Sequence, residues 1–177
     1  MKEKCCCVAL DYEAELREGG SCGEMSYTLP DGRTVMLGLE RIRAPEILFK
    51  PEFIGRDHCG LHESVYKSIL NSDLDLRRCF LGNILLSGGN TLLPGLPERL
   101  EAELSALVPH EPCSSVRVCS PSDRDYSVWC GGAVLANLPS FCGAWISQSE
   151  YDEYGPVVCS VSFDIFYWVK MRRDVQQ

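Results

Sequence analysis

Residues 81–107, LGNILLSGGNTLLPGLPERLEAELSAL, constrain the fold most, because they carry the signals of a strand, a glycine turn and a helix in succession. The apolar run at residues 84–86 is short enough to be a buried strand. Gly88 and Gly89 then break this run, and without a Cβ they let the backbone turn sharply or let a ligand approach it closely. Pro97 stands where a first helical residue would. Four leucines at helical spacing share one face of the helix: Leu96, Leu100, Leu104 and Leu107.

This order predicts an α/β unit of the kind that binds ligands at the carboxyl ends of its strands. The glycine turn itself has two interpretations, a plain strand-to-helix connection or a ligand site. On shape alone the plain connection is favoured, since short glycine patterns often match by accident. The turn is not a Walker loop, because no Lys-Ser or Lys-Thr follows the glycines.

Composition excludes several classes of protein. The chain has 177 residues, 45% of them hydrophobic, which suits one domain or a little more with a core of its own. A net charge of -8 argues against nucleic acid as a main partner, because phosphate binding needs a basic surface. No apolar run reaches the roughly eighteen residues of a membrane span, and no secretory signal is expected. The 11 cysteines include no Cys-x-x-Cys pair, so we interpret them as reduced cytosolic thiols.

Two clusters are weak candidates for chemistry. His58 and His62 have i, i+4 spacing and would share a helix face, but no second ligand pair has matching spacing, so solvent-facing or capping histidines are favoured over a metal site. Asp73 and Asp75 precede two arginines, a pattern more typical of a solvated helix entry than of a catalytic pair. We therefore predict no metal site and no catalytic residue.

Local patterns predict the remaining elements. Residues 5–10 are expected to form a strand, residues 26–37 a hairpin around Asp31 and Gly32, residues 61–70 an amphipathic helix and residues 116–119 a short strand. Pro45 is expected at a helix start. Residues 126–138 are expected to form a helix with small residues on one side, and Pro139 to restart a short one.

Six ordered segments carry a resemblance to a known family. Residues 86–95, LSGGNTLLPG, resemble the L-S-G-G-[ST]-T-x-x-x-G segment of actin and the actin-related proteins. Further matching segments occur in the family's order at residues 1–4, 27–32, 40–49, 126–132 and 145–151. The chain is therefore identified as a member of the actin family that resembles only the family's C-terminal half. From Val157 onward the tail diverges, and it is either a strand-like or membrane-surface segment or a disordered, non-native end.

The resemblance implies an α/β fold, an actin-like (ribonuclease H-like or Hsp70 ATPase-like) second lobe that is incomplete. It divides the chain into four parts. They are an outer subdomain remnant at 1–56, an α/β subdomain with the Ser-Gly-Gly turn at 57–125, C-terminal helices of the first-lobe base at 126–156, and the divergent tail at 157–177.

The resemblance also implies a nucleotide site, but only its adenosine side. In the family, the glycine-rich hairpins that hold the phosphates and the metal lie before the position of Met1. Lys2 and Glu3 match the pair that contacts base and ribose. The turn along the nucleotide and the wall beneath the adenine are matched by Gly88, Gly89, Asn90, Leu92 and Leu93. Two departures weaken the site, because Leu93 stands where actin has a tyrosine and Asp125 where actin has a lysine.

The resemblance further implies that the helix at 126–138 lines an apolar groove, which in the family receives helices of cytoskeletal or actin-binding proteins. Its lining is matched by Cys130, Val134, Leu135, Leu138 and Ala144. The expected function is that of a truncated actin-like cytoskeletal protein of the cytoplasm that acts through protein interactions, with no cofactor and no ATPase activity of its own. One alternative is an ATPase that binds ATP with magnesium when the missing N-terminal half is supplied. The other is a partially folded, non-functional splice product.

Overall fold

The computed structural model describes residues 1–17, 23–109 and 115–158, without the side chains of 142–144. The chain divides into two compact units, Met1–Val128 and Trp129–Gln177, and each is described by itself. Among the described residues, every helix is too short or too polar to cross a lipid bilayer.

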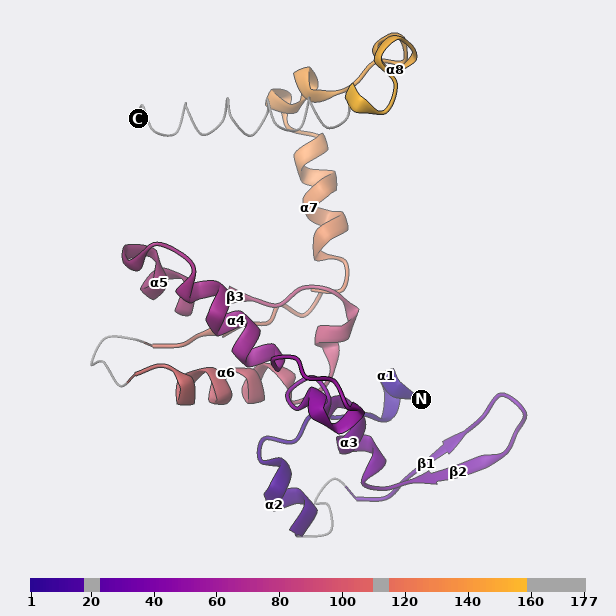
Figure 1. Ribbon diagram of the computed structural model, residues 1–177. Helices are drawn as coiled ribbons and strands as arrows, with labels where there is room; N and C mark the ends of the chain where they lie inside the picture. The colour runs from indigo at the N-terminus through magenta and orange to yellow at the C-terminus, as the bar shows by residue number, and fades with distance from the viewer. Residues whose placement is uncertain (18–22, 110–114, 159–177) are drawn as a thin grey trace. The chain divides into compact units, whose positions relative to one another are not determined.

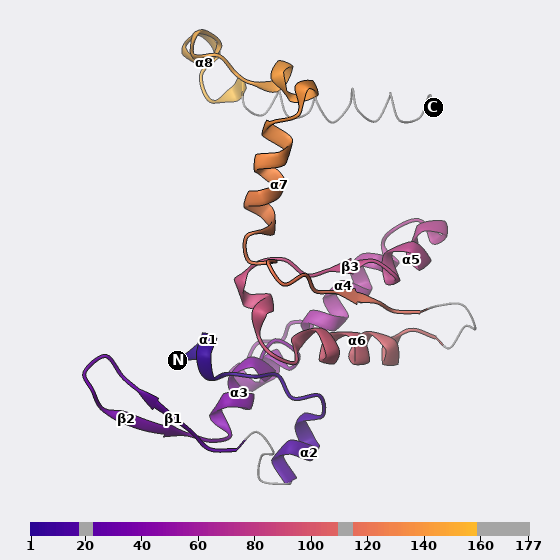
Figure 2. The same cartoon turned by 180° about the vertical axis from the view of Figure 1, so that it is seen from behind.

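The first unit combines helices with short strands (Figures 1 and 2). Its elements are α1 (Lys2–Cys5), α2 (Tyr12–Arg17), β1 (Met25–Thr28), β2 (Thr34–Leu37), α3 (Glu40–Glu46), η1 (Pro51–Ile54), α4 (Leu61–Leu70), α5 (Leu74–Leu81), β3 (Ile84–Leu85), η2 (Gly89–Leu92), α6 (Leu96–Leu107) and β4 (Val118–Cys119). The second unit contains most of α7 (Ser127–Ala136), then η3 (Pro139–Ala144) and α8 (Gln148–Tyr154).

The hairpin predicted from sequence is confirmed. β1 and β2 pair antiparallel, with Met25 opposite Leu37 and Thr28 opposite Thr34. Gly32 in the connecting turn has a φ of +83°, which favours glycine. The ribbon extends away from the rest of its unit in both views (Figures 1 and 2).

The strand, turn and helix at residues 81–107 are also confirmed and form the centre of the first unit. β3 pairs with β4 in parallel, Ile84 opposite Val118. One face of α6 packs beneath them through leucines that are at most 2% exposed, and α4 lies beside α6 (Figures 1 and 2). The buried cluster consists of Val8, Phe49, Leu86, Leu96, Leu100 and Leu104. Leu107, which was predicted to share this helix face, is 37% exposed, because it lies in the last turn of α6.

A buried ion pair joins α3 to α6 and was not predicted. The Arg99 guanidinium donates to both carboxylate oxygens of Glu46, at 3.0 and 3.2 Å, and to the carbonyl of Ala9 at 2.7 Å. Both side chains are at most 5% exposed. Because all these groups are away from water, each charge depends on its partner for stabilisation.

Two predictions of local structure are corrected, and one helix was missed. The strand at residues 5–10 is wrong: α1 ends at Cys5, and the N–H groups of Cys7 and Val8 donate to the carbonyls of Arg41 and Pro94 rather than to a strand. Pro45 lies in the last turn of α3, not at a helix start. The sequence analysis also missed α2, which begins after Asp11, whose carboxylate accepts a hydrogen bond from the N–H of Ala14.

The two histidines do not share a helix face, because α4 begins at Leu61 and leaves His58 in the preceding loop. Both line a cavity of about 240 Å³ beside Arg99 and Glu103. Within the described ranges, no three Cys, His, Asp or Glu side chains are grouped closely enough to hold a metal ion.

The second unit continues α7 as predicted, and Pro139 begins η3. α8 begins with a capping box: the hydroxyl of Ser147 accepts a hydrogen bond from the Glu150 N–H, and the Glu150 carboxylate accepts one from the Ser147 N–H. The alternating tail residues that were interpreted as a possible strand lie outside the described residues.

Candidate functional site

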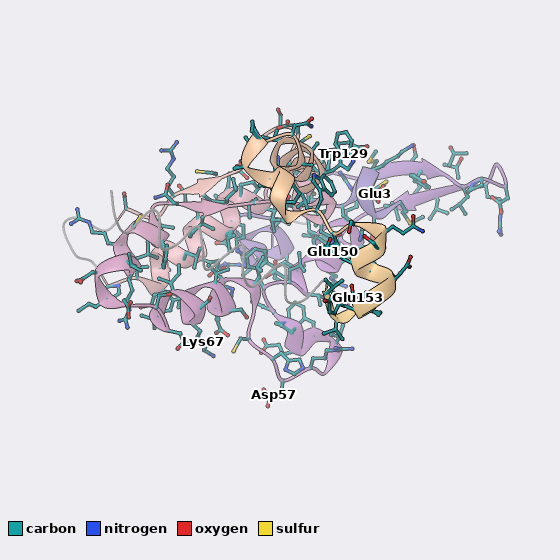
Figure 3. All side chains as sticks on the ribbon, turned by 90° about the horizontal axis from the view of Figure 1, so that it is seen from above. Glu3, Asp57, Lys67, Trp129, Glu150 and Glu153 are labelled. Atoms are coloured by element: carbon teal, nitrogen blue, oxygen red, sulfur yellow. The ribbon has the colours of Figure 1, made fainter. Side chains whose placement is uncertain are left out.

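Three segments of the first unit, far apart in the sequence, line one cavity of about 510 Å³. α1 contributes Lys2 and Glu3, the latter labelled in Figure 3. The turn after β3 contributes Gly89, Asn90, Leu92 and Leu93, and the loop before α7 contributes Asp125. The structure thus brings together all the residues predicted for the adenosine side of a nucleotide site except Gly88, which adjoins the cavity as the N-cap of η2.

The glycine turn is held in place by hydrogen bonds on both sides. The N–H of Gly88 donates to the Arg124 carbonyl at 2.8 Å, and its own carbonyl accepts the Thr91 hydroxyl at 2.7 Å. The Arg124 guanidinium donates to the carbonyls of Thr91 and Pro121, at 2.9 and 2.8 Å. Gly88 has a φ of +90°, a conformation that favours glycine. Because Arg124 binds the turn through both its backbone and its side chain, the position of the next residue, Asp125, is fixed beside the cavity.

The N-terminal segment is anchored to the same turn. The Lys2 ammonium donates to Asn90 Oδ1 at 3.2 Å. Further along, the Val8 N–H donates to the Pro94 carbonyl at 2.8 Å. These bonds place Lys2 and Glu3 opposite the glycine turn, across a sequence separation of 88 residues between Lys2 and Asn90.

One wall of the cavity is apolar. Leu93 is half-buried and packs against the core cluster, while Leu92 is 42% exposed. Leu93 on the core, with the exposed Leu92 in the same lining, offers apolar surface that suits an aromatic ring system.

The rim of the cavity carries more negative than positive charge. Two carboxylates, Glu3 and Asp125, and one ammonium, Lys2, line it. Arg124 does not line the cavity, and its guanidinium is directed to backbone carbonyls instead. The site therefore offers apolar surface and hydrogen-bonding groups, but little positive charge for an anion.

A comparison with known families now identifies the fold. The family model described as Actin matches residues 1–164 of this chain. The chain belongs to the actin family. Its mixed helix and strand content, with the parallel pair β3–β4 over α6, fits the α/β actin-like fold.

The actin family implies ATP with magnesium as a ligand, and the cavity fits only part of it. The leucine wall and the polar groups of Lys2, Glu3 and Asn90 suit a purine and a ribose. The two carboxylates on the rim do not suit a triphosphate, because like charges at short range repel.

The second group of predicted residues lies on α7 and η3. The side chains of Cys130, Val134, Leu135 and Leu138 are exposed, Val134 by 65%. Trp129, labelled in Figure 3, is 73% exposed on the same helix. Ala144 ends η3, but its side chain lies outside the described part of the chain. α7 therefore presents bulky apolar side chains, although whether they form a groove stays a prediction.

Sequence reasoning missed two residues that shape the cavity, Arg124 and Gly95. A single arginine before a helix gives no signal of its own, because its partners Thr91 and Gly88 are more than 30 residues away. Gly95 follows Pro94, and because a Pro-Gly dipeptide is typical of turns, a turn there was foreseeable. Its close approach to Val8 was not.

Proposed function

We propose that this actin-family chain acts by binding rather than by catalysis. Its cavity between α1 and η2 holds the adenosine part of a ligand, and α7 engages a helix of a cytoskeletal or actin-binding protein. In this proposal the described α/β unit corresponds to the second lobe of the family fold, and the protein works in the cytoplasm with the cytoskeleton.

The observation that carries the adenosine site is the convergence of three distant segments on one cavity. The adenine ring would lie on Leu92 and Leu93. Glu3 can accept hydrogen bonds from ribose hydroxyls, and the Asn90 amide can both donate and accept. The hydrogen bonds of Arg124 and Lys2 form these walls in advance, and this lowers the entropic cost of binding.

The expected affinity is modest. Adenosine has about 19 non-hydrogen atoms, and about 0.3 kcal/mol per atom gives a Kd on the order of 0.1 mM. Isothermal titration calorimetry at high protein concentration, or NMR titration, measures affinities in this range.

Filling the cavity provides the direct test. Gly89 has no atom within 4 Å of a Cβ built on it, and its φ is one that side chains adopt. Gly89→Trp should therefore fold normally and abolish adenosine binding. The control is Met36→Trp, which adds the same side chain on the exposed hairpin, where Met36 is 58% exposed. Unchanged adenosine binding by folded Gly89→Trp would place the ligand elsewhere and refute this site.

We also propose that this chain alone does not hydrolyse ATP. Phosphoryl transfer depends on positioning and on stabilising negative charge, and the carboxylates of Glu3 and Asp125 oppose both. Phosphate release with ATP and magnesium should equal the buffer blank. Magnesium-dependent turnover that survives purification and disappears in Gly89→Trp would instead support the alternative, an ATPase.

The partner site rests on the exposed apolar side chains of α7. An amphipathic helix that docks there would use anchors at i, i+3, i+4 and i+7. Fluorescence anisotropy with a labelled amphipathic helical peptide from an actin-binding protein measures this binding directly.

Leu135→Asp should weaken peptide binding at least about tenfold, since a carboxylate would be buried against an apolar anchor. The control Ser140→Asp adds the same charge at an exposed position of η3. Equal binding by both variants would show that this face is not the docking surface.

A third possibility is a partially folded product without function. A thermal melt followed by circular dichroism distinguishes it. A cooperative transition whose midpoint temperature rises with adenosine supports the binding function. A gradual loss of signal that adenosine does not change supports the partially folded product.

A further inference from the structure

The charged groups around the adenosine cavity determine which form of an adenine ligand it accepts. Lys2, Glu3 and Asp125 line it, which leaves an excess of one negative charge at neutral pH. The Lys2 ammonium already donates to Asn90 Oδ1. A phosphorylated ligand would therefore meet two carboxylates and one ammonium that already has a hydrogen-bond partner.

Arg124 directly precedes Asp125 and could balance its charge, but the Arg124 guanidinium is hydrogen-bonded to other groups. Its Nη1 donates to the Pro121 carbonyl at 2.8 Å, its Nη2 to the Thr91 carbonyl at 2.9 Å, and its Nε to Thr91 Oγ1 at 3.1 Å. Turning this side chain toward a phosphate would break these bonds and release the glycine turn. The same bonds hold the backbone beside Asp125 in place at the cavity that its side chain lines.

We infer that the cavity selects an unphosphorylated adenine nucleoside over ATP, with Asp125 as the residue that excludes phosphate. This inference rests on the proposed adenosine site and adds its specificity. Each phosphate adds negative charge near the two carboxylates that line the cavity, so affinity should fall in the order adenosine, AMP, ADP, ATP. Adenosine should bind at least about tenfold more tightly than ATP at low salt, since one unit of charge at a few ångströms changes affinity by about this factor at a protein surface.

Salt dependence distinguishes this charge effect from a steric one. Screening weakens the repulsion between exposed charges, so the ratio of the two affinities should shrink between about 20 mM and 500 mM salt. A cavity that is simply too small for phosphates would give the same ratio at both concentrations.

The experiment is calorimetric titration of the whole chain with adenosine, AMP, ADP and ATP, each with and without magnesium, at both salt concentrations. Asp125→Lys should bring ATP to at least the affinity of adenosine, and Asp125→Asn should give an intermediate ratio. Asp125 is exposed, so both variants should fold. The control is Asp57→Lys, which makes the same change in net charge at an exposed position outside the cavity, labelled in Figure 3. Asp57→Lys should leave the ratio of the adenosine affinity to the ATP affinity within about twofold of the wild-type value.

The outcomes separate the inference from the function beneath it. If the wild-type chain binds ATP more tightly than adenosine, phosphate exclusion is wrong and the adenosine site stands. If Asp57→Lys changes the ratio as much as Asp125→Lys, net charge rather than Asp125 is responsible, and the assignment to Asp125 is wrong. If no adenine ligand binds at all, the proposed function fails, and the inference fails with it.

Discussion

Gly95 lies so close to the backbone carbonyl oxygen of Val8 that a Cβ added at Gly95 would collide with that oxygen. This contact, with the bond from the Val8 N–H to the Pro94 carbonyl, holds the N-terminal segment against the entry of α6. Because that segment carries Lys2 and Glu3, the contact also determines where one side of the cavity lies.

A Gly95→Ala substitution tests this contact. Its Cβ would collide with backbone, which cannot move aside as a flexible side chain can, so one segment must shift. Gly32→Ala is a closely matched control, because Gly32 has nearly the same φ, +83° against +82°, and no atom within 4 Å of a Cβ. Backbone strain should lower the free energy of unfolding of the control by about 1 kcal/mol. Gly95→Ala should lower it by at least about 2 kcal/mol more. If urea denaturation shows equal losses of stability for the two variants, the N-terminal segment can move away from the entry of α6 without cost, and the contact does not hold it there.

The leucine face of α6 is the second target. Leu104 is fully buried, so Leu104→Ala should lower the free energy of unfolding by about 2–5 kcal/mol through lost burial and the cavity left behind. Leu107→Ala, three residues along the same helix at a position that is 37% exposed, should cost about 1 kcal/mol or less. Chemical denaturation of the two variants measures the difference. Similar losses would contradict the register of α6.

The strand, turn and helix around Gly88 could be predicted because each has a local signal, namely an apolar run, paired glycines and leucines at helical spacing. Residues 5–10 misled the same reasoning. Their apolar run resembles a strand, but the N–H groups of Cys7 and Val8 find partners in a helix and a loop. A backbone partner more than 30 residues away leaves no trace in a local pattern.

The candidate site was predictable by resemblance rather than by local chemistry. The lining residues come from three segments, and only the family's residue pattern links Lys2 to Asn90 before the fold is known. The hydrogen bonds of Arg124 and the pair Arg99–Glu46 were not predicted, since charged residues in helices and loops are usually solvated.

The buried pair Arg99–Glu46 makes a third prediction. Glu46→Ala should cost about 3–5 kcal/mol, because it leaves the Arg99 guanidinium buried with fewer partners. The double variant Glu46→Leu/Arg99→Leu should cost clearly less than the sum of Glu46→Leu and Arg99→Leu made singly, since no unpaired charge remains. Glu13→Ala is the control: its exposed pair with Lys50 should contribute about 1 kcal/mol or less. Additive losses in the double-mutant cycle would show that the two charges do not depend on each other.

The capping box of α8 gives a prediction about pH. Hydrogen bonds from the Ser147 N–H and hydroxyl hold the pKa of the Glu150 carboxyl below its ordinary value. Because this pKa is lower in the folded chain, the unfolded chain binds the proton at a higher pH than the folded chain does. The contribution of this carboxylate to α8 is therefore complete at neutral pH and is lost as the pH falls below about 4.

NMR titration of the Glu150 carboxyl carbon measures that pKa. Ser147→Ala should raise it only part of the way toward the ordinary value, because the backbone bond remains. Amide exchange in α8 should become faster in the same variant. A titration curve that does not change in Ser147→Ala would show that the capping box does not form in solution.

Contacts between bound adenosine and the leucine wall test the adenosine site most directly. With leucine methyl groups labelled, nuclear Overhauser effects from the adenine H2 and H8 protons identify the side chains that touch the ring. We expect them to the methyls of Leu92 and Leu93, and we expect them to vanish in Gly89→Trp, whose added ring fills the same cavity. Effects confined to other leucines, such as Leu135 and Leu138 of the second unit, would place adenosine outside this cavity and contradict the proposed site.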